Sequence, residues 1–276
     1  MKYEYVNKDK LTAYRDFIPS QLITGAISGA YRILGVRVFE EPCGALVWEK
    51  EKGTDRGFLR SIYVDPTFRR IGAGEILLSG LWDEAGKEGV GTIAFSFSPL
   101  GDPAMILPFF EDMNIQTELY TFPFAEHTLD EISVALKKKK IGNAAMCGEE
   151  ISTLDRAKRN VLRGWLSENF HEPLSAYITP EVPGFAVIKD SSVDAVLLMS
   201  GSDNGILSLD YLYQKGNDRK LLAGLLSSSV KRYTQIFRPD TTIQMMLTTD
   251  EACALHDGLF GRSEDMIVVC RGEILL

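Results

Sequence analysis

Residues 64–74 read Val64-Asp65-Pro66-Thr67-Phe68-Arg69-Arg70-Ile71-Gly72-Ala73-Gly74, and this stretch decides the fold. The apolar run that leads into it, residues 58–64, predicts a strand. Pro66 ends that strand because proline has no amide hydrogen for the ladder. Beyond the stretch, apolar residues recur at helical spacing from residue 74 to residue 87. A glycine-rich turn therefore joins a strand to the start of a helix.

The chemistry of this turn favours an anion. The first backbone amides of a helix have no partner within the helix, and the helix dipole adds positive charge there, so a pyrophosphate can bind directly. Glycines let the backbone approach the phosphates, and the two arginines can add charged hydrogen bonds. Glu75 stands where a P-loop needs lysine, and Leu77 stands where a dinucleotide fingerprint needs its third glycine. Neither of those motifs fits.

The segments around the turn predict alternating strands and helices. A hairpin is expected over residues 31–48 with its turn at residues 40–44, because two alternating runs flank a polar segment. Downstream, we expect a strand at residues 92–97, a short helix at 104–113 and a strand at 116–124. Such alternation predicts an α/β fold with a mixed sheet.

The last third of the chain repeats this order. It predicts a strand, a helix, a strand, a short helix and a strand, over residues 206–213, 220–234, 242–247, 251–259 and 266–270. Because the order matches that of residues 58–115, duplication is the simplest explanation. Two expected helices lie between the halves, at residues 129–141 and 154–170. We therefore predict three parts: a first domain, a helical connection and a second domain, over residues 1–128, 129–172 and 173–276.

The ordered set of motifs resembles the GNAT superfamily of N-acetyltransferases. The central motif of that family is a strand ending in Val-x-Pro, then Arg-x-x-Gly-x-Gly or Ala at the start of a long helix, and residues 64–74 follow it. The resemblance is strong over residues 31–124 and weaker over residues 206–272. It implies two tandem GNAT-like acyl-CoA N-acyltransferase domains. The second would be degenerate and would not bind coenzyme, because its turn at residues 214–219 lacks Gly-x-Gly.

The resemblance also implies a coenzyme site in the first domain, with acetyl-CoA as cosubstrate. The pantetheine would lie along the strand that ends at Val64, whose amide would polarise the thioester carbonyl. The amides of the turn would hold the pyrophosphate. The residues that this implies for coenzyme binding are Ile62, Tyr63, Val64, Arg69, Arg70, Ile71, Gly72, Ala73, Gly74 and Phe110. Tyr63 should point to the opposite face from its two neighbours on the strand.

The sequence alone does not identify the catalytic residues. Phe110 stands where the family usually has the tyrosine that acts as general acid, and Arg60 and Ser61 occupy the strand that often carries a glutamate base. Ser98 and Asp65 remain as weak candidates, and an aspartate in that position is more typical of a turn. Two hypotheses follow. The first is an enzyme that moves an acetyl group from acetyl-CoA to a primary amine, on a small molecule or a protein. The second is a non-catalytic acyl-CoA-binding or regulatory protein.

Composition narrows the class of protein. The 276 residues are 45% hydrophobic, and 30 basic against 38 acidic residues give a net charge of −8, which disfavours a nucleic-acid partner. The chain shows no signal segment and no apolar run long enough for a membrane span, and its four cysteines form no C-x-x-C pair. We therefore expect a cytoplasmic protein that is not bound to a membrane and that could form a homodimer. No metal site is expected, because each histidine stands alone: His127, His171 and His256.

Overall fold

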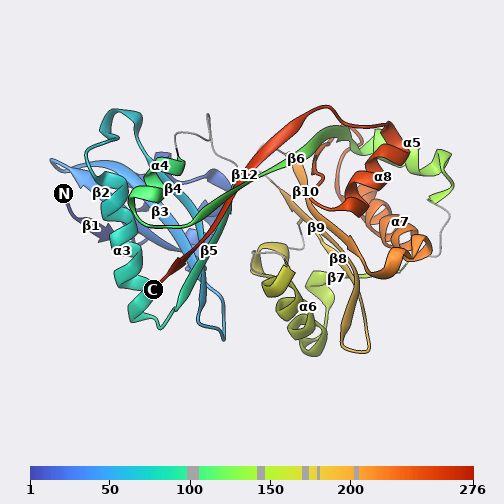
Figure 1. Cartoon of the computed structure of the whole chain (residues 1–276), viewed down its shortest axis with the longest axis horizontal. Coiled ribbons are helices and arrows are strands. Elements are labelled where there is room, and N and C mark those ends of the chain that lie inside the picture. The colour runs from blue at the N-terminus through green and yellow to red at the C-terminus, as the bar shows by residue number, and fades with distance from the viewer. Residues whose placement is uncertain (98–105, 142–146, 170–173, 179–180, 202–204) are drawn as a thin grey trace. The chain divides into compact units, whose positions relative to one another are not determined.

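The computed structural model describes residues 1–97, 106–141, 147–169, 174–178, 181–201 and 205–276. The chain folds into two compact units, each with its own sheet and core. Unit 1 comprises Met1–Tyr120 and Val268–Leu276, and unit 2 comprises Thr121–Ile267. Figure 1 labels the elements of both units. The predicted α/β class with mixed sheets is confirmed.

The sheet of unit 1 has the strand order β1-β2-β3-β4-β5-β12. Its strands are β1 (Tyr3–Tyr5), β2 (Arg32–Val38), β3 (Glu41–Lys50), β4 (Arg56–Val64), β5 (Thr92–Phe97) and β12 (Met266–Leu275). Neighbours are antiparallel except for β4 and β5, which are parallel. The β2–β3 turn is shorter than predicted, because it consists of Phe39 and Glu40 with φ of 47° and 72°. Such a two-residue turn matches the twist of its strands, so β3 already begins at Glu41.

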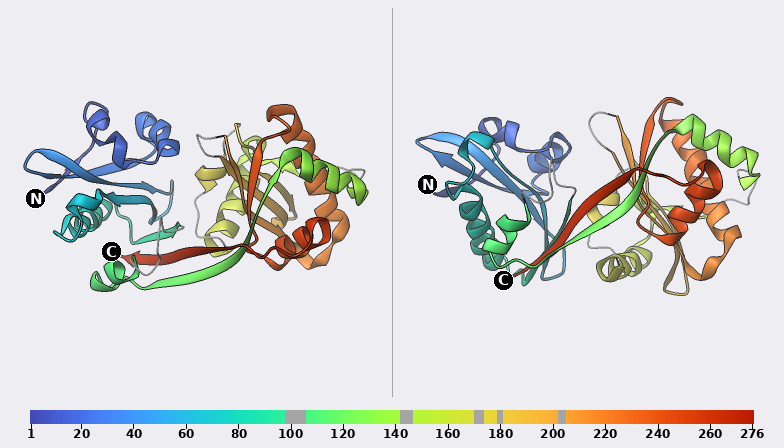
Figure 2. Two further views of the ribbon diagram at one scale, coloured as in Figure 1. Left: turned by 90° about the horizontal axis from the view of Figure 1, so that it is seen from above. Right: turned by 45° about the horizontal axis from the view of Figure 1, so that its top comes forward.

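Helices cover both faces of this sheet (Figure 2). They are α1 (Leu11–Tyr14), α2 (Ser20–Ser28), α3 (Ala73–Lys87) and α4 (Leu107–Asp112). Leu77, Leu78 and Leu81 of α3 pack on one face of the sheet with α4. Tyr14 and Leu22, from α1 and α2, pack on the other face. Both faces of the central strands are therefore buried, which accounts for the long apolar run in β3.

The sheet of unit 2 has the order β6-β11-β10-β9-β8-β7. Its strands are β6 (Thr117–Thr128), β7 (Glu149–Glu150), β8 (Phe185–Lys189), β9 (Ser192–Gly201), β10 (Leu207–Gln214) and β11 (Thr242–Met246). Here β10 and β11 are parallel, and the other registers are antiparallel. The parallel pair occupies the same place in this sheet as β4 and β5 occupy in unit 1. The predicted tandem fold is confirmed.

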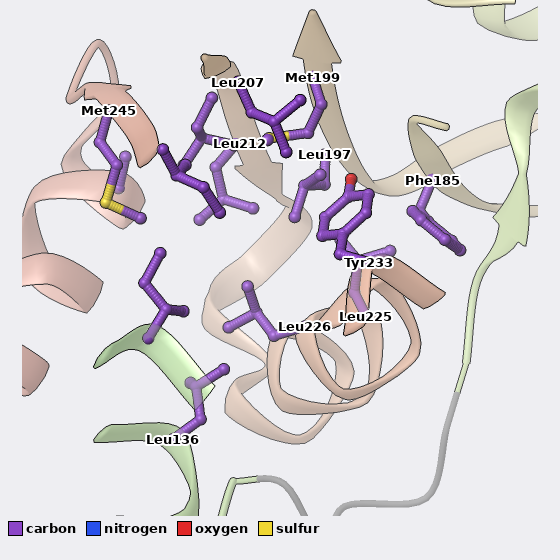
Figure 3. Close-up of a cluster of buried hydrophobic side chains, with 14 of the residues drawn as sticks. Leu136, Phe185, Leu197, Met199, Leu207, Leu212, Leu225, Leu226, Tyr233 and Met245 are labelled. Carbon is purple, nitrogen blue, oxygen red and sulfur yellow. The ribbon is translucent and has the colours of Figure 1, made fainter. Parts of the chain in front are cut away.

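The helices of unit 2 are α5 (Leu129–Lys138), α6 (Arg156–Asn169), α7 (Arg219–Ile236) and α8 (Asp250–Phe260). Figure 3 shows the core that α5, α7 and α8 form against the sheet. Leu225 and Tyr233 of α7 are buried there against Phe185 and Leu197 of the strands. On the other face, α6 buries Leu162 and Leu166. None of the helices in the described part of the chain has the length and apolar character of a membrane span.

Each unit takes one strand from the other half of the chain. The C-terminal strand β12 pairs with β5 of unit 1, from Cys270 opposite Phe97 to Leu275 opposite Thr92. Conversely, β6 follows the elements of unit 1 and pairs with β11 of unit 2. The units therefore differ from the predicted domains 1–128, 129–172 and 173–276. The segment 129–172 also differs, because its helices α5 and α6 pack in the cores of unit 2.

Candidate functional site

In unit 1, strands β4 and β5 pair for only part of their length. The parallel register joins Arg56–Phe58 to Thr92–Ala94, while β4 continues to Val64 and β5 to Phe97. After Leu59, the register of β4 against β3 shifts, and Arg60 is the extra residue of this bulge. A bulge bends its strand and increases the local twist. The bulge therefore lies where β4 separates from β5.

Two backbone amides of β4 face the side from which β5 has separated. The amide of Asp65 donates to the carbonyl of Cys43 at 2.9 Å, and Val64 lies opposite Gly44. In an antiparallel ladder, this pattern turns the amide of Val64 away from β3. Ile62, two residues earlier, has the same orientation. Both amides can therefore donate to a group that lies along β4.

The turn after β4 presents further amides. Gly72, the N-cap of α3, has φ of 87°, and Arg70 has φ of 62°, so two left-handed residues lie close together. Left-handed residues within a turn can direct neighbouring amides toward one side, which is the geometry of anion-binding nests. Among the residues that the structure describes, no side chain caps α3. The first amides of this 15-residue helix are therefore positioned to bind an anion.

Arg69 and Asp65 hold the turn in place. The Nε atom of Arg69 donates to the carbonyl of Val64 at 2.9 Å, and its guanidinium lies 5.7 Å from the ring centre of Tyr63. The carboxylate of Asp65 accepts a hydrogen bond from the amide of Thr67 at 2.8 Å and another from its hydroxyl. These bonds lower the pKa of Asp65. Asp65, one of the two catalytic candidates, thus has the contacts of a turn-capping residue.

The remaining residues of the turn differ in their surroundings. Ile71 and Arg70 are exposed, whereas Ala73 is buried in the core under α3. Gly74 packs against the ring of Phe109, since a Cβ there would lie 2.8 Å from its Cε2 atom. A Cβ on Gly72 would meet no atom of the described residues within 4 Å. Glycine is therefore needed at the two positions for different reasons. Gly72 adopts the left-handed conformation, and Gly74 leaves room for Phe109.

Phe110 lies in the core and not at a surface that a ligand could reach. Its side chain is 0% exposed, and its ring stacks on Phe95 with centroids 4.8 Å apart. Contact with a coenzyme would require the ring to leave this stack. Tyr63 is half-buried, and its ring stacks on Phe17 at 6.4 Å. Ser98, the other catalytic candidate, lies outside the described residues.

The equivalent places in unit 2 are filled by the chain's own side chains. The carboxylate of Asp218 caps α7, accepting from the amides of Lys220 at 2.9 Å and Leu221 at 3.1 Å. Beyond the paired part of β10 and β11, the hydroxyl of Thr249 donates to the carbonyl of Leu212 at 2.6 Å. Sequence reasoning found the missing glycines but overlooked both polar contacts. Aspartate just before a helix is an N-cap signal that could have revealed the first.

Two histidines that the sequence treats as isolated meet in unit 2. The Nε2 atoms of His127, on β6, and His256, on α8, lie 3.0 Å apart. His256 is buried, and the ring of His127 stacks on Phe260 with centroids 3.7 Å apart. Burial, together with the neighbouring imidazole, lowers the pKa of His127. Within the described residues, no third histidine, cysteine or carboxylate completes a metal-binding group. His171 lies outside those residues.

Comparison with known proteins finds a family model that matches part of unit 1. Residues 9–107 match the model of the acetyltransferase (GNAT) family. This segment includes β2 to β5, α3 and the turn between Val64 and Gly74. A search of curated protein sequences found no match.

Solved structures extend the likeness to both units. A GCN5-related N-acetyltransferase from Kribbella flavida aligns with 100% of this chain and 71% of its own, at 14% identity and a TM-score of 0.55. A tandem GNAT protein of the clavulanic acid biosynthesis pathway aligns over 99% of this chain and 98% of its own, at 13% identity and 0.55. The glucosamine N-acetyltransferase region of a fungal β-N-acetylglucosaminidase reaches 0.60 at 13% identity, over 98% of this chain and 38% of its own.

Identities this low show the fold alone, so the similarity to the family rests on the family model, which matches residues 9–107. Of the resemblance stated over residues 31–124, the part up to residue 107 is thereby confirmed. Acyl transfer from acyl-CoA is the activity of that family. Residues 9–107 of the chain are therefore similar to the GNAT family of acetyltransferases.

Proposed function

We propose that unit 1 binds acetyl-CoA along β4 and the turn that follows it, and transfers the acetyl group to a primary amine. The observation that carries this proposal is the combination of two features within unit 1. No side chain in the described part of the chain caps α3, and β4 carries amides that face away from β3. In unit 2, Asp218 and Thr249 occupy both corresponding places. The contrast favours unit 1 as the coenzyme-binding half.

Each part of the coenzyme would then have its own protein partner. The pyrophosphate would accept from the first amides of α3, with Arg70 exposed beside them. The pantetheine would follow β4, and the amide of Ile62 or Val64 would polarise the thioester carbonyl. An amine held close to this carbon gains from proximity and orientation without a covalent enzyme intermediate. This assignment keeps the predicted coenzyme-binding residues except Phe110, which the core encloses.

The test is thioester turnover with a panel of primary amines, from small diamines and amino acids to lysine peptides. The wild-type protein should release free thiol from acetyl-CoA with at least one of them, and mass spectrometry should find the N-acetylated amine. Acetyl-CoA at 100 times its dissociation constant should also stabilise the protein by about 2.7 kcal/mol. Absence of any thermal shift would contradict the proposal at its first step.

A second candidate is a protein that binds acyl-CoA without catalysis. One observation favours it: the buried phenylalanine, Phe110, where the family usually has a tyrosine, offers no proton to a leaving thiolate. This candidate predicts the same thermal shift but no thiol release with any amine. The two measurements together therefore separate an enzyme, a binding protein and a protein that does not bind the coenzyme.

A further inference from the structure

Glu49 is a carboxylate buried within the sheet of unit 1. Glu49 is only 5% exposed, and carboxylate side chains are rarely buried so completely. It lies on β3 two residues after Val47, which packs with the side chains of α1 and α2. Because side chains alternate along a strand, Glu49 points to that face and not to the face under α3.

The neighbours of Glu49 place it where β4 leaves β5. Its cross-strand partner is Phe58, the last residue of β4 in register with β5. The bulged residue Arg60 contacts it, with the guanidinium Nε 3.6 Å from a carboxylate oxygen. That distance makes an ion pair longer than an ordinary hydrogen bond. Glu49 thus lies one strand away from the opening, at the level along the sheet where the pairing of β4 with β5 ends.

The opened part of β4 is partly exposed on both faces. On the α3 face, Leu59, Phe95 and Phe110 are buried in one core, but Ile62 and Val64 are half-buried. On the other face, Ser61 and Tyr63 are half-buried as well. An acceptor that approaches a thioester lying along β4 from the α1 and α2 face would come from the face that carries Glu49.

We propose that Glu49 binds the ammonium group of the acceptor and takes its proton. The proposal rests on the function proposed above. An alkylamine is protonated at neutral pH, so it must lose one proton before it can attack. That proton would pass to the Glu49 carboxylate through a chain of water molecules, and then to solvent. The nitrogen forms a bond to the thioester carbon, the carbon–sulfur bond breaks, and the second proton of the nitrogen goes to the coenzyme thiolate.

Arg60 has a positioning role in this arrangement. Its guanidinium lies beside Glu49, with Nε 3.6 Å from one carboxylate oxygen, and so holds that carboxylate in place. The acceptor class is therefore a cationic primary amine. A neutral or anionic acceptor would gain nothing from this carboxylate.

The experiment compares Glu49→Gln and Glu49→Asp with Glu51→Gln, using the amine on which the wild-type protein is most active. Glu51 is a matched control because it is a second buried glutamate, 8% exposed, just beyond the end of β3. Glu49→Gln should lower kcat by about 100-fold or more, the usual contribution of a proton-transfer group. The dissociation constant for acetyl-CoA should stay unchanged, and Glu51→Gln should keep the wild-type kcat.

The possible outcomes distinguish a catalytic role of Glu49 from a structural one, and both from a failure of the proposed acetyl transfer. Equal kcat values for Glu49→Gln and Glu51→Gln would overturn the role of Glu49 alone. Loss of coenzyme binding together with kcat in Glu49→Gln would show a structural role instead. If Glu49→Gln does not fold, Glu49→Asp takes its place, since its shortened carboxylate should lower kcat without changing coenzyme affinity; a wild-type kcat there would overturn the proposal. Absence of turnover in the wild-type protein would overturn the proposed function itself.

Discussion

The conformation of one residue, Gly72, determines how the turn meets α3. Its φ is 87°, and the position that a Cβ atom would take is open. Adding a side chain therefore costs conformational free energy but causes no steric clash. We expect Gly72→Ala to destabilise unit 1 by about 1–2 kcal/mol, because an L-residue resists the left-handed region. Coenzyme affinity should fall as well, because the same strain would displace the amides that follow.

Gly86→Ala provides the matched control for this substitution. Gly86 lies within the same helix, also has nothing within 4 Å, and has no positive φ. Alanine there should stabilise the helix by about 0.5–1 kcal/mol. Chemical denaturation and calorimetric titration of both variants with acetyl-CoA measure these effects. Equal behaviour of the two variants would show that the conformation of Gly72 has no special role.

At the scale of elements, the carboxylate of Asp218 caps the N-terminus of α7 and occupies two of its free amides. We expect Asp218→Ala to destabilise unit 2 by about 1 kcal/mol, since two amides lose their acceptor. Asp218→Asn should retain most of the stability, because asparagine is an equally good cap. Hydrogen exchange of peptides from α7 would measure both. Unchanged exchange in Asp218→Ala would contradict the capping role.

The histidine pair between β6 and α8 makes unit 2 sensitive to acid. The folded state lowers the pKa of His127 below its ordinary value of 6.5, so the unfolded chain binds this proton more readily. The free energy of unfolding of unit 2 is therefore highest above about pH 6.5. It decreases as the pH falls through the pKa that His127 has in the folded state. Hydrogen exchange of β10 and β11 peptides at about pH 5 and pH 7.5 should show this loss. In His127→Gln the loss should be smaller; an equal loss would assign it to other groups.

The order of elements could be read from the sequence because periodicity is local. Residues 58–97 and 207–260 follow the predicted alternation closely, since each amphipathic run is decided by its own side chains. β8 and β9 were not predicted, although Asp190 and Ser191 separate two apolar runs as a turn should. The position of β12 could not be read at all. Its partner β5 lies far away along the chain, and no local pattern specifies such a pairing.

In the candidate site, too, local features could be predicted from the sequence and contacts between distant segments could not. The turn from Val64 to Gly74 was predicted from its spacing, and its residues do form the start of α3. Contacts between distant segments were not predicted. Phe109 on Gly74, Phe110 on Phe95 and Arg60 beside Glu49 each join different elements, and only the folded structure brings them together.

At the scale of the whole molecule, the exchanged strand β12 links the C-terminus to the stability of unit 1. Ile274 is 2% exposed in the core under α3. We expect Ile274→Ala to destabilise unit 1 by about 2–5 kcal/mol, the usual cost of such a cavity. In a Trp165→Phe background the remaining tryptophans, Trp48 and Trp82, both belong to unit 1 and report its unfolding.

Ile243→Ala on β11 is the control for this prediction, because Ile243 is 4% exposed in the core of unit 2. In the same background, it should leave the unit 1 signal unchanged. If Ile274→Ala also left that signal unchanged, β12 would not be part of the unit 1 core.

The claim that one half of the molecule binds the coenzyme is tested most directly by calorimetric titration of the full chain with acetyl-CoA. The structure predicts one bound coenzyme per chain, with affinity reduced by Gly72→Ala in unit 1 and unchanged by Asp218→Asn in unit 2. Two coenzymes per chain, or a single site that Gly72→Ala leaves intact, would contradict the account.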